Sequence, residues 1–422
     1  AIFTGAKILP EIKELILNRA AGNPLYIEEF THTLLENGTI QKKNEQYFLI
    51  GNTSDIQIPD SVSGIIAARI DRLQDNLKRA MQEASVIGID FKFRILQTIT
   101  GMKAEIKSIL LNLQELEFIY EKTLFPELEY IFKHALAQEV TYNSLLIKRR
   151  KEIHEKIGMA IEQIYQDRLE EFYEILAHHF AKSDNYEKAY QYLIFSGKKA
   201  TRNYSNWEAL QFYREAIDVL DRIPSNYSNQ RKGLQARISL AKPAMFLSYP
   251  GDSIDVLKVG VKLAKEVGDI RSLANLDGTL AHAYAIKGES ILAIEHAEKC
   301  FQGAQKIQDL DLMAPVARDL TSAYMFAGKL TKTVPIFSTV IPLIEKANKC
   351  SESFGRPASV YTFLCGLAGF IMGFLGSFNE AEKLCEKALV NALKNNDLYE
   401  LAYSEFSYAV SYTHLTLPTI RF

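Results

Sequence analysis

The sequence contains none of the short motifs that mark a self-sufficient catalytic site. No GxxxxGK[ST] phosphate-binding loop, HExxH zinc motif or GxSxG nucleophile turn occurs along its 422 residues. Without a loop to hold phosphates, the γ-phosphate of ATP cannot be positioned for transfer. We therefore predict that the chain has no catalytic residues and no metal site, and that it does not turn over ATP by itself.

Cysteine is scarce. The sequence has four, without a CxxC pair and all in its last third, namely Cys300, Cys350, Cys365 and Cys385. This spacing is typical of reduced core thiols, and it favours neither disulfides nor zinc binding. The neighbours His178 and His179 likewise have no Cys or carboxylate motif beside them that would form a metal site.

An excess of one charge is also absent. The 49 Lys and Arg are balanced by 51 Asp and Glu, a formal net charge of −2, so no overall field attracts nucleic acid or an anionic membrane. The only dense basic run is Lys148 to Lys151. It is either a nucleic-acid contact or a solvated helix face answered by Glu152 and Glu155, and we favour the solvated face.

Signals for export and membrane insertion are weak. The first residues lack the basic and continuous apolar regions of a signal peptide, and the absence of an initiator Met indicates a cut through a longer protein. One apolar run, residues 360 to 376, approaches the length of a membrane span, but a repeat-like turn and helix follow it. We predict a buried helix there, a cytoplasmic chain and no membrane contact.

What the sequence does contain is helical periodicity, with 47% hydrophobic and 24% charged residues. Apolar positions between Pro10 and Asn37 predict two helices around a Gly22-Asn23-Pro24 turn. Residues 39 to 50 alternate loosely between two glycines and predict a hairpin. We assign residues 1 to 50 to one unit.

The next unit is predicted for residues 51 to 168. A helix should begin after Asp60 or Ser61, and a second after Gln74. A further helix pair spans residues 92 to 116, and two strands on either side of Pro126 should pair Ile119, Tyr120 and Leu124 with residues 130 to 132. Helices closed by such a wing predict a winged-helix-like segment.

Residues 169 to 410 predict about five or six helix pairs of the tetratricopeptide type. Four glycines recur at turns with spacings of 37, 40 and 48 residues: Gly251, Gly288, Gly328 and Gly376. Three aspartates precede similar apolar-Ala pairs: Asp269, Asp309 and Asp397. Such an array is an α-solenoid whose groove suits a protein or peptide partner. The fold class expected for the whole chain is mainly α.

The end of the sequence differs from the repeats. Codons for residues 410 to 419, VSYTHLTLPT, match a transposon-end adapter used in sequencing libraries, and the segment breaks the helical period. We therefore predict that residues 411 to 422 are a non-native tail that the repeats do not need.

Several segments together carry a family resemblance. RAAGNPLYIEEF, Arg19 to Phe30, resembles the lid-helix motif of signal-transducing (STAND-like) AAA-type ATPases. IPDSVSGIIAARIDRL, ASVIGIDF and YIFKHALAQEVTYNSLLIKRRKEIHEKIGMAIE follow in the order seen in bacterial multidomain cyclases and kinases. The resemblance covers residues 8 to 220. It implies that ATP or ADP binds in an intact parent protein, and no cofactor is expected for the present chain alone.

The resemblance also implies particular nucleotide contacts. Gly22, Asn23 and Pro24 would form the turn that packs against the nucleotide, with the Pro24 ring on the adenine. His134 lies where related proteins carry a histidine that reads the β-phosphate, although a histidine bonded to the backbone at a helix start is the alternative. The implied parent is an adenylate or guanylate cyclase. A maltose-activator type transcription regulator and a serine/threonine kinase are the alternatives.

Overall fold

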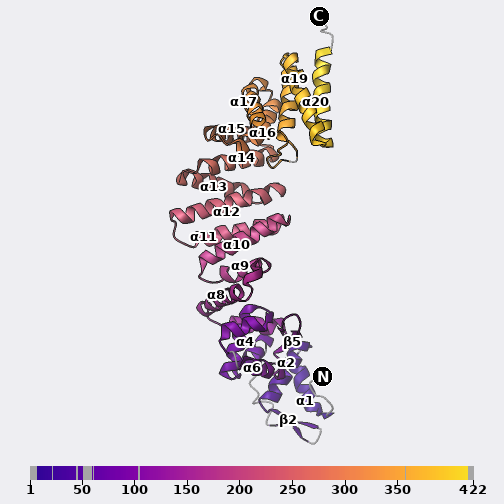
Figure 1. The fold of residues 1–422 in the computed structure, drawn as a ribbon. Coiled ribbons are helices and arrows are strands. Elements are labelled where there is room, and N and C mark those ends of the chain that lie inside the picture. Colours follow the sequence, from indigo (N-terminus) through magenta and orange to yellow (C-terminus); the bar gives the residue numbers. More distant parts are fainter. Residues whose placement is uncertain are drawn as a thin grey trace. The chain divides into compact units, whose positions relative to one another are not determined.

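The computed structural model describes residues 7–20, 22–43, 46–50, 59, 61–102, 105–356 and 358–416. The chain divides into two compact units, Ala1–Tyr192 and Leu193–Phe422. Figure 1 shows helices through most of both units, with short strands confined to the first. The mainly α fold class predicted from the sequence is confirmed.

The first unit begins with a helix pair and a small sheet. The turn at Gly22 separates the two helices as predicted, and the predicted hairpin is present. Strands β2 and β3 are antiparallel, and β1 pairs with β3 in parallel. The elements are β1 (Lys7–Ile8), α1 (Pro10–Ala20), α2 (Pro24–Glu36), β2 (Ile40–Lys43) and β3 (Gln46–Leu49). Their apolar faces share one core, in which Ile12, Phe30 and Leu34 are buried.

The winged-helix-like segment follows, and its helices lie where the sequence predicts them. They are α3 (Val62–Asp71), α4 (Asp75–Ile87), α5 (Phe93–Thr100) and α6 (Ile106–Glu115). Ser61 caps α3, because its Oγ accepts a hydrogen bond from the Gly64 N–H at 3.1 Å. The other predicted cap, Asp60, lies outside the described residues.

The wing has three strands rather than the two expected from the sequence: β4 (Asp90–Lys92), β5 (Ile119–Thr123) and β6 (Glu129–Phe132), in the order β4-β6-β5. Ile119 pairs with Phe132 and Tyr120 with Ile131, as predicted. Leu124 lies beyond the last pair and is 72% exposed, so its predicted pairing is wrong. Strand β4 was missed because three residues between helices are too short for an alternating pattern.

The remaining helices of the first unit lead toward the repeats. They are α7 (Ala135–Asn143), α8 (Ile147–Ile164), the 3₁₀ helix η2 (Gln166–Phe172), α9 (Tyr173–Ala181) and the first part of α10 (Tyr186–Arg202). Helix α8 packs against α5, α4 and α9. Close contact between α8 and α9 is possible because Gly158 lies against the Phe180 ring, where a Cβ atom would come within 2.5 Å.

The second unit is a succession of helices that pack against their sequence neighbours. After α10 they are α11 (Asn206–Asp221), α12 (Tyr227–Phe246), α13 (Ser253–Val267), α14 (Ile270–Ile286), α15 (Ser290–Lys306), α16 (Leu310–Phe326), η3 (Leu330–Lys332), α17 (Val334–Lys346), α18 (Val360–Phe374), α19 (Phe378–Asn395) and α20 (Leu398–Thr416). The even-numbered helices from α12 to α20 also contact one another, which makes them one layer of a tetratricopeptide-like array.

The glycines and aspartates that recur in the sequence have defined roles in this array. All four predicted turn glycines adopt a positive φ, between 58° and 80°, which ends one helix and starts the next. The three aspartates are N-caps. Asp269 accepts from the Ser272 N–H, Asp309 from Leu312, and Asp397 from Tyr399 and Glu400.

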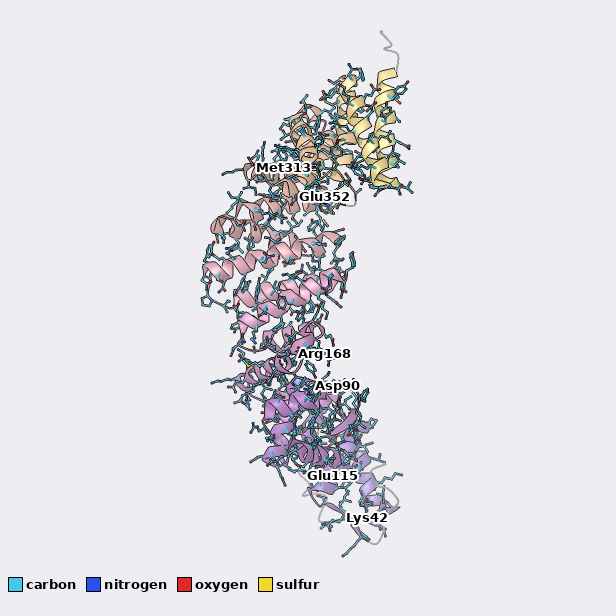
Figure 2. All side chains as sticks on the ribbon, viewed as in Figure 1. Lys42, Asp90, Glu115, Arg168, Met313 and Glu352 are labelled. Carbon is cyan, nitrogen blue, oxygen red and sulfur yellow. The ribbon has the colours of Figure 1, made fainter. Side chains whose placement is uncertain are left out.

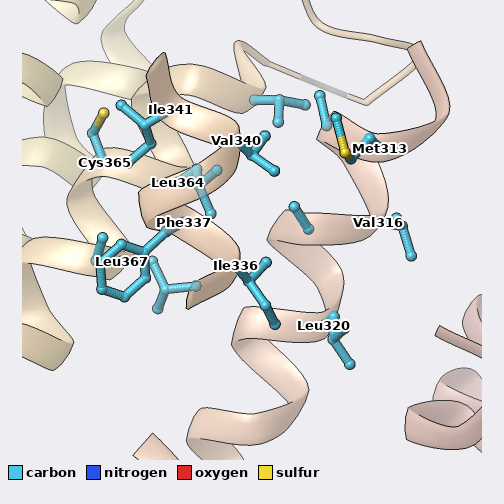
Figure 3. Close-up of a cluster of buried hydrophobic side chains, with 14 of the residues drawn as sticks. Met313, Val316, Leu320, Ile336, Phe337, Val340, Ile341, Leu364, Cys365 and Leu367 are labelled. Atoms are coloured by element: carbon cyan, nitrogen blue, oxygen red, sulfur yellow. The ribbon is translucent and has the colours of Figure 1, made fainter. Parts of the chain in front are cut away.

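The predicted buried helix within residues 360 to 376 is confirmed. Thirteen residues of α18 are buried, so the helix is apolar on all sides within the array. In Figure 3, Ile336, Phe337 and Val340 of α17 lie among side chains of α16 and α18. Of the cysteines, three are buried and Cys350 is partly buried, all as free thiols. In the described part of the chain, no helix combines the length and apolar character needed to cross a membrane.

Helix α20 does not end where the predicted tail begins. It continues to Thr416, so the break in helical period predicted for residues 413 to 419 does not occur at residues 413 to 416. Ser411 is 7% exposed, and its Oγ donates to the Ser407 carbonyl oxygen at 3.0 Å. The helix tolerates the segment because Tyr, Thr and His are acceptable within a continuing helix. The adapter origin of the segment stays a prediction, and residues 417–422 lie outside the described residues.

Candidate functional site

The predicted nucleotide turn forms the start of α2. Gly22 has a φ of +83°, a conformation that glycine adopts without strain. Asn23 is the N-cap, and its side-chain oxygen accepts from the Leu25 N–H at 3.0 Å and the Tyr26 N–H at 3.2 Å. Pro24 is the first helical residue and is exposed. The turn is therefore a well-capped helix start with a solvent-facing proline ring.

His134 lies at the N-cap position of α7, directly after strand β6. Its side chain makes no capping hydrogen bond to the start of α7. Instead Nε2 lies 3.6 Å from Glu28 Oε2 and 4.0 Å from Glu29 Oε1. This nitrogen is buried without a hydrogen-bond partner among the described residues.

The two predicted contacts therefore meet on one helix. Pro24 and Glu28 are four residues apart on α2, so they share a helix face about 6 Å apart along the axis. His134 faces Glu28 from α7. The structure thus brings the turn of residues 22 to 24 and His134 to the same side of α2, although 110 residues separate Pro24 from His134 in the sequence.

A network of charges surrounds this position, which we call the charge cluster. Lys133 forms ion pairs with Glu28 of α2 and Glu117 of the winged-helix segment, and His32 Nε2 lies 3.4 Å from Glu117. Its members are Glu28, Glu29, His32, Glu36, Arg69, Glu117, Lys133 and His134. Most of these pairs link α2 to the winged-helix segment or to the start of α7, so the cluster fastens these parts together.

Arg69 is the most deeply buried charge of the cluster, at 2% exposure. Its guanidinium donates to Glu29 at 2.5 Å, to both oxygens of Glu36 at 3.1 Å, and to the Leu116 carbonyl oxygen at 3.0 Å. It also lies 4.6 Å from the Phe118 ring centre. Five donors on a planar group can satisfy this many partners, which a lysine could not.

The pKa values reflect these contacts. Burial alone lowers the pKa of Lys133, but hydrogen bonds to Glu117 and Glu28 outweigh it and raise the pKa. Burial raises the pKa of Glu28, yet the contact with Lys133 leaves it lowered. The pKa of His32 is lowered by burial and then by Arg69, which favours a neutral imidazole.

The same cluster contains the one grouping of donors that could hold a metal ion among the described residues. Donor atoms of Glu28, His32 and Glu117 lie within 4.8 Å of one another. However, the Lys133 ammonium is already bonded to both carboxylates. A metal would have to displace that cation, and the predicted absence of a metal site stays a prediction.

A separate open cleft of about 470 Å³ lies between α3 and α7. Pro24 and His134 do not line it. Its walls combine small and apolar residues with two carboxylates and are formed by Ser63, Gly64, Ala67, Ile70, Asp71, Leu136, Glu139, Val140, Asn143 and Ser144.

The basic run at residues 148 to 151 is largely engaged within the protein. Arg149 pairs with Glu83 and Glu152, and Lys151 pairs with Asp184. Arg150 donates to two carbonyl oxygens and lies 4.6 Å from the Tyr142 ring. The predicted partner Glu152 is therefore one of several, and the other carboxylates come from α4 and the loop after α9.

Sequence reasoning missed the charge cluster, although a signal for its buried pair was present. Glu29 lies on the apolar face of α2, between Tyr26 and Thr33, and Arg69 lies on that of α3, beside Ile66 and Ile70. A lone charge on each of two adjacent apolar faces predicts a buried ion pair.

Comparison with known protein sequences gives a partial match. No family model matches the chain. Over 214 residues, 50% of the chain, the sequence is 24% identical to an uncharacterized protein of Rhizobium meliloti (strain 1021), and the match spans 20% of that relative's length. The chain therefore corresponds to about a fifth of the curated relative that it matches.

Two solved structures of helical proteins show a distant likeness. One is a Signal Transduction ATPase with Numerous Domains with a tetratricopeptide repeat sensor from Pyrococcus horikoshii, with 13% identity, a TM-score of 0.41, and coverage of 96% of this chain and 60% of that one. The other is aspartyl phosphate phosphatase F from Bacillus subtilis, with 14% identity, a TM-score of 0.43, and coverage of 86% and 81%. At TM-scores below 0.5, no function is carried over from them.

Proposed function

We propose that this chain is the regulatory part of a nucleotide-controlled signalling protein. Its first unit would carry the lid and winged helix that close over a nucleotide, and its repeats would bind a protein or peptide that controls the closure. One observation carries the proposal: His134 and the turn of residues 22 to 24 converge on the same side of α2. A parent protein would supply the phosphate-binding loop.

The charge cluster suggests how a nucleotide would be sensed. Glu28 is the anion that currently faces Lys133 and His134. A β-phosphate arriving at this position would replace Glu28 as the acceptor for both groups, and its greater charge would strengthen the interaction. A ligand shifts an equilibrium between two forms only when it binds one form more tightly than the other. The nucleotide would therefore stabilise the closed form to the extent that it binds the closed form more tightly than the open one.

The repeats would provide the opposing control. Stacked helix pairs form a continuous surface on which an extended partner can lie. A partner that binds better to the open form would release the lid, by the same linkage. The parent's output domain is proposed to be a nucleotidyl cyclase, with a transcription regulator or a protein kinase as the alternatives; an upstream cyclase or kinase domain, or a downstream helix-turn-helix, would identify it.

The test uses the intact parent protein. His134→Ala should shorten the retention of ADP and raise basal output, because a hydrogen bond to a charged group worth about 1.5 to 3 kcal/mol is lost. The matched control is His296→Ala, which removes an imidazole that faces Asp277 in the repeats. Unchanged ADP affinity and unchanged basal output in His134→Ala would contradict the proposed sensor role.

The present chain alone should show no ATP turnover, since it has no phosphate-binding loop. Release of inorganic phosphate from purified chain, followed against a heat-denatured sample, measures this. Turnover that survives further purification would refute the assignment of the first unit.

A further inference from the structure

Helix α2 presents two metal-ligating side chains on one of its faces. Glu28 and His32 are four residues apart, so they lie one turn from each other along the helix. A third such side chain, that of Glu117, comes from the connection between α6 and β5. One donor atom from each of the three residues lies within 4.8 Å of the other two. Ligands of Zn²⁺ lie about 2.0 to 2.2 Å from the ion, so small side-chain rotations would let one ion contact all three.

The imidazole of His32 has a nitrogen that the protein does not use. Its Nε2 atom is buried and has no hydrogen-bond partner among the described residues. The same atom faces the carboxylate of Glu117, 3.4 Å from its Oε2. A buried polar atom without a partner costs free energy, and imidazole nitrogens are common metal ligands. This nitrogen is therefore directed at the place where a metal ion would lie.

The charge cluster contains more carboxylates than cations. Its four carboxylates face two permanent cations, so its formal charge is −2 when histidine is counted as neutral. The carboxylates are those of Glu28, Glu29, Glu36 and Glu117, and the cations are Arg69 and Lys133. Arg69 pairs with Glu29 and Glu36, which leaves Lys133 to balance the other two carboxylates. A divalent ion would bring two charges to the place where Lys133 brings one.

Lys133 is the cation with which a metal ion would compete. Its ammonium pairs with both Glu28 and Glu117, and it lies 5.8 Å from the Tyr120 ring centre. A lysine has a flexible four-carbon stem, so its ammonium can move aside while the backbone stays in place. The side chain of Glu117 is 41% exposed, which gives an ion access from solvent. Exchange of the ammonium for a metal ion therefore needs no unfolding.

We infer that Glu28, His32 and Glu117 form a binding site for a divalent transition-metal ion such as Zn²⁺, which displaces the Lys133 ammonium. One imidazole and two carboxylates suit Zn²⁺, whereas Mg²⁺ prefers oxygen ligands. The bound ion would link α2 to the winged-helix segment. This inference departs from the absence of a metal site expected from the sequence. No local motif marks the site, because Glu117 lies 85 residues after His32.

The test is a calorimetric titration of the chelator-treated full chain with Zn²⁺ at neutral pH. We expect a saturable site and no comparable binding of Mg²⁺ at the same concentrations. Co²⁺ resembles Zn²⁺ in its choice of ligands, and its visible absorption spectrum reports binding directly. Binding of Mg²⁺ as tight as that of Zn²⁺ would mean that the carboxylates act only as an unspecific acidic surface, and would overturn the inference.

His32→Ala should weaken Zn²⁺ binding about tenfold or more, since even the loss of a group that only orients a metal ligand costs about 10- to 100-fold. The matched control is His296→Ala, which removes an imidazole that faces a single carboxylate, that of Asp277, in the repeats. This control should leave the affinity unchanged. A loss of affinity in His296→Ala, with none in His32→Ala, would place the metal elsewhere and overturn the inference.

Lys133→Met tests the same site in the opposite direction. It should strengthen Zn²⁺ binding about tenfold or more, because a positive charge is removed from the position that the ion takes. Misfolding cannot produce such a gain. The control is Lys122→Met, which removes a lysine of the wing that pairs with Asp90 outside the charge cluster. Unchanged or weaker Zn²⁺ binding in Lys133→Met would contradict the displacement of the ammonium and, with it, the inference.

The metal site goes beyond the proposed function and does not depend on it. The titrations contain no nucleotide and use the present chain, whereas the proposed sensing by His134 is measured by ADP retention in the parent. Failure of Zn²⁺ to bind would therefore leave the nucleotide proposal standing. Unchanged ADP retention in His134→Ala would likewise leave the metal site standing.

Discussion

The contacts that stabilise the first unit internally differ in kind from those that stabilise the second. In the first unit, contacts between residues far apart in sequence are charged and singular: Arg69 pairs with Glu29, 40 residues away, and with Glu36, 33 residues away. In the second, small and apolar residues recur, and the Asp269 type of helix cap repeats along the array, beside long-range polar contacts such as that of Ser359 with Glu400, 41 residues apart. A change in the first unit therefore removes a contact that nothing replaces, whereas the second repeats its contacts along the array.

The strongest test of this difference is Arg69→Met. The substitution leaves Glu29 buried without its partner, which costs about 3 to 5 kcal/mol. We expect the amides of α2 and α3 to lose hydrogen-exchange protection while those of α13 to α16 keep theirs. Mass spectrometry of peptides from the full chain measures both at once. Arg72→Met, at a position beside the same helix that is exposed, is the control and should change neither.

A second variant separates the cost of a lost contact from that of an unpaired charge. Arg69→Met combined with Glu29→Leu replaces the pair by apolar side chains and should recover much of the lost protection. If the double variant is no better than Arg69→Met, the packing of the guanidinium on Phe118 and Glu36 matters more than its pairing with Glu29.

In the repeats, the largest expected effect comes from overpacking. A Cβ atom on Gly369 of α18 would lie 2.5 Å from Cys385 Sγ and 3.0 Å from the Ala381 carbonyl oxygen, so Gly369→Ala should destabilise the array by about 1 to 3 kcal/mol. Gly373→Ala in the same helix meets the Ser411 Oγ atom first, at 3.4 Å, which is an ordinary van der Waals contact. That control should be neutral or stabilising, because Ala favours a helix. Urea denaturation followed by circular dichroism ranks the two variants.

The helix caps provide a smaller and more uniform effect. Asp269→Ala, Asp309→Ala and Asp397→Ala should each cost about 1 kcal/mol, since each removes a comparable N-cap acceptor. The exposed Asp218 lies inside α11 and caps no helix, and Asp218→Ala should cost nothing measurable. The same urea experiment applies. Costs that differ by several-fold among the three caps would show that the repeats are less equivalent than their sequence pattern indicates.

A further test concerns pH in the first unit. His154 Nδ1 lies 2.9 Å from His179 Nδ1, and burial lowers the pKa of His154 to about 3 and that of His179 well below 6.5, with smaller contributions from Lys182 and His178. Between pH 6.5 and pH 3, the unfolded chain binds more protons than the folded one. The free energy of unfolding should therefore fall as pH drops from 6.5 toward 3.

His154→Gln should reduce this pH dependence. Urea midpoints of the first unit, measured at about pH 7 and about pH 5, should differ less in the variant than in the wild type. The change in urea midpoint between the two pH values is diagnostic. The midpoint at either pH alone is not, since the substitution also alters packing. Equal pH dependence in both proteins would mean that the histidine pair does not govern acid sensitivity.

The sequence predicts the periodic features of this protein better than those that depend on contacts between single residues. The helix pair around Gly22, the turn glycines and the buried α18 follow from spacing and composition, which repeat or extend over many residues. Strand β4 and the pairing of Arg69 with Glu29 depend on single residues brought together by the fold. Likewise, the convergence of Pro24 and His134 on α2 needs the junction between β6 and α7 to lie beside Glu28, which no local pattern encodes.

Helix α18 has a consequence for how the end of the array unfolds. A linear array usually frays from its ends, because each terminal repeat is held by one neighbour only. Helix α18 contacts α16, α17, α19 and α20, and its sides are apolar all around. Side chains fill the spaces between these helices (Figure 2). Peeling away α20 alone would expose apolar surface of α18 to water, so these five helices should melt as a single cooperative block.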